Sequence, residues 1–180
     1  MALPSDECRH PGGEALTRKL LEMAALSPCR ILDMGAGCGQ SVALLRSLGF
    51  DALGIDAQPC AEDLIRGNIL SCPFPDGAFD AILTECAFYA SGNTNAALLE
   101  ASRLLRPGGK LLFSDVFFDT EEALRALARS AGLRPLSVAD ETPLWKSYYL
   151  RCVWNGTNAA LCAPVPGKKC CYYLMIAQKE

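Results

Sequence analysis

The sequence predicts an α/β protein, in which a mostly parallel sheet carries helices on both faces. The clearest sign is the first unit: Arg30–Met34 is a short apolar run, and Ser41–Leu48 has apolar residues at helical spacing. Gly49 ends that helix, and "FDALGIDA" follows as a second strand that ends at Asp56. A strand, helix, strand unit favours parallel pairing through a right-handed crossover. Strands that alternate with helices along a chain indicate a sheet with both faces covered.

Local signals predict the other elements in order. Helices are expected at Pro11–Leu26, Asn95–Leu105, Glu121–Ser130 and Pro143–Trp154, and strands in "DLIRGNIL", "FDAILTECAFYA", "KLLFSDVFF", Leu133–Ala139 and "CCYYLMIAQ". The helix before "RPGG" should end there, because proline and glycine both stop helices. The connection "AQPCAE" is too short for more than about one helical turn, so the second crossover is expected to be truncated.

Size and charge limit the possible classes of protein. The 180 residues are 51% apolar and 21% charged, which suits one compact domain. A net charge of −3 and a pI near 5.3 disfavour non-specific binding to nucleic acid or to an anionic membrane. Neither a secretory leader nor an apolar run of membrane-spanning length is evident. We therefore expect a cytoplasmic protein whose partner is a small molecule.

Ten cysteines are many for this length, yet their spacing does not indicate a zinc site. The chain has no Cys-x-x-Cys pair and a single histidine, His10. Free thiols, mostly packed as small apolar side chains, are the expectation, and no metal site is predicted. One alternative stays open, because soft metals or metalloids prefer thiolates. Its candidate ligands are the denser C-terminal group of Cys152, Cys162, Cys170 and Cys171.

The loop "DMGAGCGQ" carries the main functional signal. Its glycines are spaced Gly35-x-Gly37-x-Gly39, which is not the Gly-x-Gly-x-x-Gly of a dinucleotide site, and no Gly-Lys-Ser/Thr follows. Asp33 before the loop disfavours a bound pyrophosphate but can accept charge-assisted hydrogen bonds from an ammonium group. The pattern favours a cationic ligand that carries a nucleoside.

Two later residues fit the nucleoside. Asp56 ends the second strand 21 residues after Gly35, a separation at which a carboxylate accepts hydrogen bonds from a ribose diol. Asn68, at the end of the third predicted strand, has an amide that can pair with an adenine edge. The simpler alternatives are a helix cap for Asp56 and a turn-forming role for Asn68.

Four motifs in order, "ILDMGAGCGQS", "GID", "GNILSCPFPDGAFDAI" and "LLRPGGKLLFSDV", resemble those of class I S-adenosylmethionine-dependent methyltransferases, specifically the type 11 domain. The likeness covers Arg30 to Val116. It implies a Rossmann-like, seven-stranded sheet with an antiparallel last strand, and S-adenosylmethionine as cofactor, with S-adenosylhomocysteine as product. The family commonly has aspartate at the position of Asn68, and an asparagine oxygen can still accept a hydrogen bond from an adenine amino group.

The resemblance also implies which residues hold the cofactor. The methionyl part would lie against the first loop, the ribose against the end of the second strand, and the adenine after the third; the residues are Asp33, Gly35, Ala36, Gly37, Gly39, Asp56, Ala57, Asn68, Ile69 and Glu85. One domain is expected over residues 1–180, with an N-terminal helix in 1–29, a cofactor-binding core in 30–116 and a substrate-side part in 117–180. Cys38 is expected to face the helix after the loop.

The acceptor is harder to predict. Glu85 and Cys86 follow the fourth strand and are the candidate catalytic residues, as a base or amine ligand and as a thiol. The stretch from "TECAFYA" to "SDVFFD" also resembles arsenite methyltransferases, in which a cysteine at the place of Cys86 binds arsenic. An ordinary polar strand end and a small buried residue are the alternatives for these two.

Aromatic side chains in the predicted helix Pro143–Trp154 are a second acceptor candidate. Trp145, Tyr148 and Tyr149 either enclose a substrate or pack on the core. His10 either closes over the cofactor or belongs to a helix start. The sequence thus predicts a methyltransferase for a small molecule. The alternatives are a non-catalytic cofactor-binding module that serves a partner enzyme, and a thiol-based metalloid-binding protein.

Overall fold

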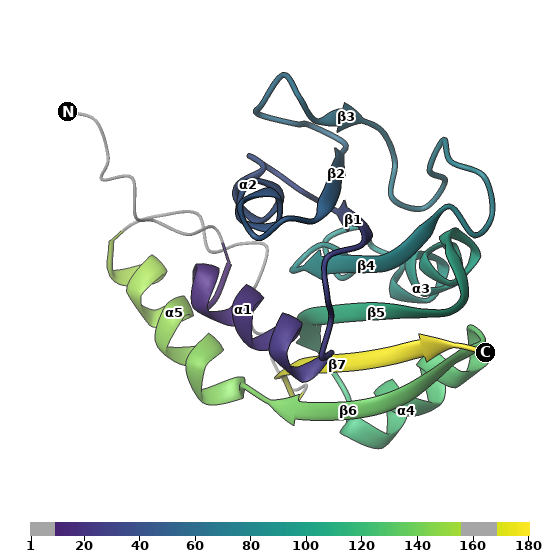
Figure 1. Ribbon diagram of the computed structural model, residues 1–180. Helices are drawn as coiled ribbons and strands as arrows, with labels where there is room; N and C mark the ends of the chain where they lie inside the picture. Colours follow the sequence, from purple (N-terminus) through teal and green to yellow (C-terminus); the bar gives the residue numbers. More distant parts are fainter. Residues whose placement is uncertain (1–9, 156–168) are drawn as a thin grey trace.

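The computed structural model describes residues 10–155 and 169–180, which form a seven-stranded sheet in the order β3-β2-β1-β4-β5-β7-β6 (Figure 1). The strands are β1 Arg30–Met34, β2 Asp51–Asp56, β3 Ile65–Arg66, β4 Phe79–Glu85, β5 Leu105–Phe117, β6 Leu133–Asp140 and β7 Cys171–Lys179. The helices are α1 Gly13–Met23, α2 Gln40–Ser47, α3 Thr94–Leu104, α4 Glu121–Ser130 and α5 Thr142–Trp154. Only β7 runs antiparallel to its neighbours β5 and β6, so the predicted fold is confirmed.

The first unit forms where its glycines and apolar residues predict. β1 is buried from Ile31 onward and pairs in parallel with β2 on one side and β4 on the other. α2 begins directly after Gly39 and ends just before Gly49, and both glycines have a positive φ, of 78° and 88°. Other residues adopt this backbone conformation only at a cost, so these glycines set the length of the helix.

The second crossover is truncated, as predicted, but the strand after it is shorter than predicted. Residues 57–64 form no helix, and β3 contains only Ile65 and Arg66. The chain turns immediately afterwards, because the Asn68 side-chain oxygen accepts a hydrogen bond from the amide of Leu70 (2.9 Å). Asn68 therefore lies in the turn after β3 rather than at the end of a strand.

β5 is longer than predicted. The motif "RPGG" does end α3, but Leu105 already pairs with Phe79 and the strand runs on through the motif. A register shift between Phe79 and Ala81 accommodates the proline, which is tolerated in a strand at such irregularities. At Gly109 a Cβ atom would lie 2.9 Å from the backbone oxygens of Arg106 in β5 and Asp80 in β4, so only glycine fits at this position.

Two apolar clusters pack on opposite faces of the sheet. One contains Leu98 of α3 and Leu124 of α4, and the other contains Leu20 of α1, Leu45 of α2 and Trp145 of α5. Figure 1 shows α1 and α5 next to each other. Among residues 10–155 and 169–180, no helix combines the length and apolar character that crossing a membrane requires. The helices leave open the edge where the parallel strands end.

Candidate functional site

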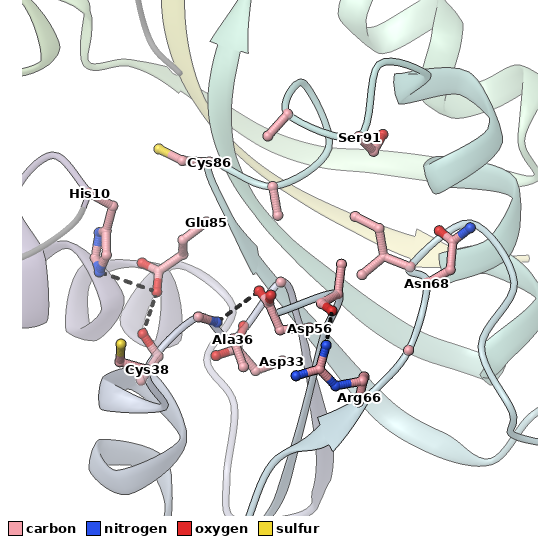
Figure 2. Close-up of a pocket in the computed structure, with 18 of the residues that line it drawn as sticks. His10, Asp33, Ala36, Cys38, Asp56, Arg66, Asn68, Glu85, Cys86 and Ser91 are labelled. Atoms are coloured by element: carbon pink, nitrogen blue, oxygen red, sulfur yellow. Dashed lines mark hydrogen bonds and ion pairs between the residues drawn. The ribbon is translucent and has the colours of Figure 1, made fainter. Parts of the chain in front are cut away.

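A cavity of about 800 Å³ lies at the carboxyl ends of β1, β2 and β4 (Figure 2). Most of the residues predicted for cofactor and acceptor line it: Asp33, Gly35, Ala36, Gly37, Asp56, Ala57, Asn68, Ile69, Glu85 and Cys86. Gly39 does not line it; this residue directly precedes α2 and lies near Leu64. Ligands bind at this edge of open α/β sheets, where the order of the strands reverses.

The glycine loop, residues 35–39, is held close to β2 and to Ala87. The amides of Gly35 and Ala36 both donate to the carbonyl of Ile55 in β2, over 2.8 and 3.1 Å. A Cβ at Gly35 would lie 2.2 Å from the Cβ of Ala87, so a larger residue cannot fit. At Gly37, by contrast, a Cβ would meet nothing within 4 Å. The loop thus packs tightly on its sheet side and presents bare backbone to the cavity.

Asp56 is tied to the glycine loop and is not a helix cap. Its Oδ2 atom accepts from the amide of Gly37 (2.9 Å), and Oδ1 accepts from the amide of Gln58 (2.7 Å). No helix follows it within residues 57–64, so the capping alternative is wrong. A carboxylate has about four acceptor positions, and those left over can still receive hydroxyl groups.

Asn68 forms a turn, which is one of the two roles that the sequence leaves open, and it also lines the cavity. Its side-chain oxygen closes the turn to Leu70, and its carbonyl accepts from the amide of Ser71 (3.0 Å). In the cavity lining, Asn68 lies across from Asp33 and Glu85 (Figure 2). Because the side-chain oxygen of Asn68 already accepts a hydrogen bond in the turn, its NH₂ group is the part more available to a ligand.

Asp33 is a buried carboxyl group with negative neighbours. It is 2% exposed, and burial raises its pKa well above the ordinary range; the charges of Glu85 and then Asp56 raise it further. No hydrogen bond to its carboxyl group is found within the described residues. A cationic guest would compensate the cost of ionising this group, which is the chemistry that an ammonium or sulfonium supplies.

Glu85 contacts two helices, α1 and α2, and the residue His10. Its oxygens accept hydrogen bonds from the hydroxyls of Thr17 in α1 (3.1 and 3.2 Å) and Ser41 in α2 (2.7 Å). The Nε2 atom of His10 lies 3.7 Å from Oε2 (Figure 2). Sequence reasoning missed Thr17 and Ser41. The available signal was a hydroxyl beside Leu16 and Leu20 on the apolar stripe of the first helix.

Cys86 stands at a strained position beside Glu85. Its φ is 57°, which is uncommon outside glycine, and its amide donates to the carbonyl of Ser114 (2.8 Å). Its Sγ atom lies 3.3 Å from the hydroxyl of Tyr172, which in turn donates to the Ser114 hydroxyl (3.2 Å). Cys86 is half-buried rather than fully packed, and it lines the cavity. Cys38 lines the cavity as well, although it was expected to face the helix.

The aromatic residues of α5 lie away from the cavity. Trp145 is 2% exposed and belongs to the core cluster, with Tyr149 stacked on it at 6.0 Å between ring centres. Neither they nor Tyr148 line the cavity. Trp145 therefore fills the core. Two residues that do line the cavity, Arg66 and Ser91, were missed by sequence reasoning. Arg66 lies within the apolar run "DLIRGNIL", and Ser91 directly follows "FDAILTECAFYA".

The C-terminal cysteines do not form a metal site in the part of the chain that the structure describes. No group of three or more His, Cys, Asp or Glu side chains there is arranged to hold a metal ion. Cys152 lies on α5 and Cys171 begins β7, and neither lines the cavity. Cys162 falls outside the described residues.

The comparisons with known proteins find methyltransferases. Residues 32–113 match the family model described as a methyltransferase domain. The chain is 32% identical over 127 residues to an arsenite methyltransferase of Aquipseudomonas alcaligenes (56% of this chain, 36% of the relative). It is 31% identical over 123 residues to malonyl-[acyl-carrier protein] O-methyltransferase 1 of Coxiella burnetii (63% and 44%). The chain thus spans less than half the length of these two relatives.

Solved structures share the fold at low sequence identity. The [4+2]-cyclase SpnF superposes with a TM-score of 0.73 at 19% identity, covering 97% of this chain and 84% of the cyclase. A Haemonchus contortus phosphoethanolamine N-methyltransferase 2, solved in complex with S-adenosyl-L-methionine, has a TM-score of 0.72 at 16% identity, covering 94% and 53%. The domain match over residues 32–113, the order of the motifs and the shared fold agree with the class I S-adenosylmethionine-dependent methyltransferase domain that the sequence predicts.

Proposed function

We propose that this chain is an enzyme that transfers a methyl group from S-adenosylmethionine to a small-molecule acceptor. The observation that carries the proposal is one cavity that collects a buried carboxyl group, a bare glycine loop and a second carboxylate in the order in which a cationic nucleoside would need them. The volume of about 800 Å³ is within the range of small-ligand sites. A net charge of −3 favours a small molecule over nucleic acid as the acceptor.

The residues present fit the cofactor. Asp33 and the backbone of Gly35–Gly37 would hold its amino-acid part, because a buried carboxyl group among like charges favours a cation. Asp56 and Ala57 would hold the ribose, and Asn68 and Ile69 the adenine. We refer to these last four residues as the nucleoside end, and to His10, Glu85 and Cys86 as the methyl end. When bound, the cofactor supplies an electrophilic methyl group on a positively charged sulfur.

At the methyl end the chain's own side chains would bind and orient the acceptor. The hydroxyls of Thr17 and Ser41 fix the Glu85 carboxylate, which leaves it poised to accept a hydrogen bond or a proton from an acceptor amine or hydroxyl. Cys86 offers a polarisable thiol beside it. Alignment of the acceptor and exclusion of water are the main contributions that such a site makes.

A trivalent metalloid is a second candidate acceptor. It is favoured by the Cys86 thiol in the cavity and by the arsenite methyltransferase among the relatives. A non-catalytic module is the candidate of a different class, favoured by the truncated second crossover. The [4+2]-cyclase shows that this fold also occurs in proteins named for other chemistry, so fold alone does not decide between them.

Calorimetry and turnover separate these candidates. Titration with S-adenosylhomocysteine should give a saturable signal, and formation of S-adenosylhomocysteine from the cofactor should depend on an added acceptor. A panel of amines, hydroxyl compounds, thiols and arsenite tests the acceptor class, with Cys86→Ser as the variant that should abolish turnover of arsenite alone. Binding without turnover on every acceptor would favour the module. Absence of binding would overturn the proposal.

A further inference from the structure

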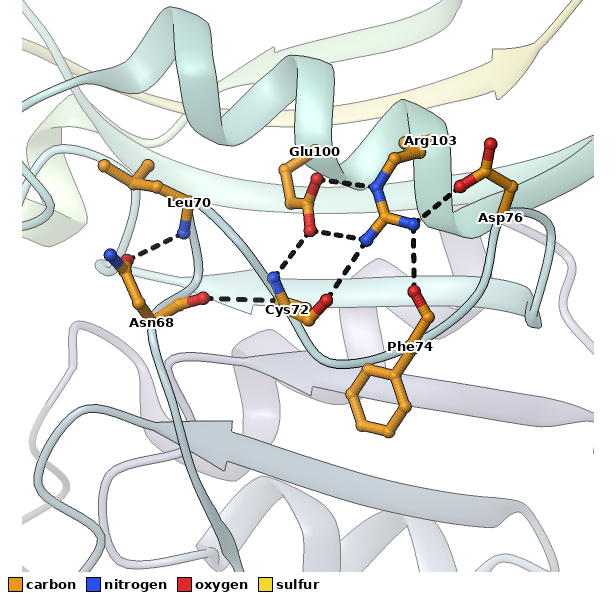
Figure 3. A network of polar contacts seen from close by, with 7 residues as sticks. All are labelled: Asn68, Leu70, Cys72, Phe74, Asp76, Glu100 and Arg103. Atoms are coloured by element: carbon orange, nitrogen blue, oxygen red, sulfur yellow. Dashed lines mark hydrogen bonds and ion pairs between the residues drawn. The ribbon is translucent and has the colours of Figure 1, made fainter.

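Two side chains of α3, Glu100 and Arg103, grip the loop that follows β3 (Figure 3). Glu100 Oε1 accepts a hydrogen bond from the amide of Cys72 (2.6 Å), and Arg103 Nη2 donates to the carbonyl of the same residue (3.2 Å). The two side chains also pair with each other, since Arg103 Nε and Nη2 donate to the two Glu100 oxygens over 2.8 and 2.7 Å. We call this pair the α3 clamp and residues 68–76 the clamped loop.

The clamp holds the clamped loop at further points along its length. Arg103 Nη1 donates to the carbonyl of Phe74 (2.9 Å) and to the carboxylate of Asp76 (2.7 Å). One guanidinium thus fixes three successive parts of the loop, which its planar array of donors allows and a lysine would not. The forked arrangement also orients the loop, because several donors in one plane permit few alternative positions.

Burial and charge show that the clamp is a fixed part of the structure. Glu100 is 9% exposed, and the hydrogen bonds from Arg103 lower its pKa despite the opposing effect of burial. The ion pair therefore persists through the neutral pH range. Burial raises the pKa of Cys72 to about 12, so its thiol stays protonated and can donate to the carbonyl of Asn68 (3.6 Å).

The clamp lies outside the cavity, but the clamped loop forms one of its walls. Asn68, Ile69 and Leu70 line the cavity, whereas Cys72, Glu100 and Arg103 do not. β3 is only two residues long, so the sheet gives this wall little support from the other side. The helix α3 instead holds the loop directly after this wall, at Cys72, Phe74 and Asp76.

We propose that Glu100 and Arg103 are positioning residues that set the nucleoside end of the site and so determine how strictly it selects the base. The inference rests on the proposed function, in which Asn68 and Ile69 face the adenine. With the clamp intact, the turn at Asn68 is held in one position, so its donor and acceptor groups match one base. With the clamp broken, the turn moves and the match is lost, while Asp33, Asp56 and the glycine loop keep the rest of the ligand.

The test compares two ligands that differ only in the base. Dissociation constants for S-adenosylhomocysteine and for S-inosylhomocysteine, in which hypoxanthine replaces adenine, are measured by calorimetry on the wild type and on Arg103→Ala, Arg103→Lys and Glu100→Gln. We expect the preference for adenine to fall by roughly tenfold in the variants, the factor that loss of one well-made hydrogen bond brings. The control is Arg125→Ala, which removes an arginine paired with Glu121 on α4, far from the cavity lining.

A second readout needs no ligand. Hydrogen exchange of the amides of residues 70–72 should become at least about tenfold faster in Arg103→Lys and Glu100→Gln, because their hydrogen bonds open more often. The amides of residues 33–40 should exchange as in the wild type. Circular dichroism identifies any variant that does not fold, and conclusions are drawn from the folded ones.

Each result decides the question. An unchanged base preference in folded clamp variants, or equal weakening of both ligands, would overturn the inference. If the wild type binds no S-adenosylhomocysteine, the proposed function fails. The exchange rates of residues 70–72 then show by themselves whether Glu100 and Arg103 position the loop. Unchanged exchange in residues 70–72 would show that α3 does not position the wall.

Discussion

The nucleoside end and the methyl end of the cavity are held together by different kinds of contact. At the nucleoside end, Asp56 and Asn68 accept hydrogen bonds from backbone amides of nearby loops. At the methyl end, Glu85 is held by the side chains of Thr17 and Ser41, which lie 68 and 44 residues away in the sequence. A backbone amide is present whatever the residue, whereas a hydroxyl depends on one side chain. The hydrogen bonds to Asp56 and Asn68 should therefore survive substitution of the residues that donate them, whereas the hydrogen bonds to Glu85 should not.

The largest effect is expected where the glycine loop touches the loop after β4. Gly35→Ala forces a Cβ to within 2.2 Å of Ala87 at a φ of 93°, so we expect a loss of about 3 kcal/mol in unfolding free energy from overpacking and backbone strain. Binding of S-adenosylhomocysteine should be undetectable. Chemical denaturation and calorimetry measure the two effects. Gly92→Ala is the matched control, because its φ is also positive, at 76°, but nothing lies within 4 Å.

A smaller effect is expected at Asp56. Asp56→Ala removes a carboxylate that accepts two backbone hydrogen bonds and is proposed to hold a ribose, so affinity for S-adenosylhomocysteine should fall by about 2 to 3 kcal/mol. Calorimetry gives the value, with the exposed Asp63→Ala as the control variant. Unchanged affinity would mean that Asp56 only braces the glycine loop.

Asp115 tests whether the methyl end has a pH-dependent support. This carboxyl group lies under the loop after β4, accepts from the amides of Tyr89 (2.9 Å) and Val116 (2.7 Å), and is 1% exposed. Burial raises its pKa to about 7 against the lowering effect of those hydrogen bonds. Between the ordinary pKa of an aspartate and this value, the folded state holds a proton that the unfolded state has lost. The stability that protonation confers is therefore lost as pH rises through about 7.

Relative to Asp115→Asn, the wild type should lose about 2 kcal/mol of unfolding free energy between about pH 5 and 8. Urea denaturation at several pH values gives the difference, and groups common to both proteins cancel. A difference that does not change with pH would contradict a raised pKa at this site.

The smallest effect is expected at Thr17. Thr17→Val keeps the shape of the side chain but removes the hydroxyl that donates a hydrogen bond to Glu85. The free energy of unfolding should therefore fall by about 1 kcal/mol. Affinity for S-adenosylhomocysteine should stay the same, whereas turnover should decline because Glu85 loses its orientation. Thr17→Ser should restore turnover. If affinity falls as much as turnover, the two ends are not independent.

The same contrast explains what could be predicted from the sequence. Asp33, Gly35, Gly37 and Asp56 lie at or just after strand ends within one continuous unit, and the structure brings them into one cavity as predicted. The hydroxyls around Glu85 come from two helices whose approach depends on the packing of the whole domain, and no local pattern marks them. β3 was overestimated because an apolar run does not reveal the turn that Asn68 closes. The division of the chain into a core and a substrate-side part stays a prediction.

The position of β7 has a consequence for how the domain acquires its shape. β7 is the last strand in chain order, yet it lies between β5 and β6, and β6 pairs with no other strand among the described residues. During synthesis β6 therefore emerges from the ribosome without a partner, and its edge stays open until Cys171–Lys179 has followed it. Contacts between residues this far apart in sequence form late and slowly. Closure of the sheet therefore waits for β7, and a chain that stops before Cys171 exposes unpaired edges of β5 and β6 to aggregation.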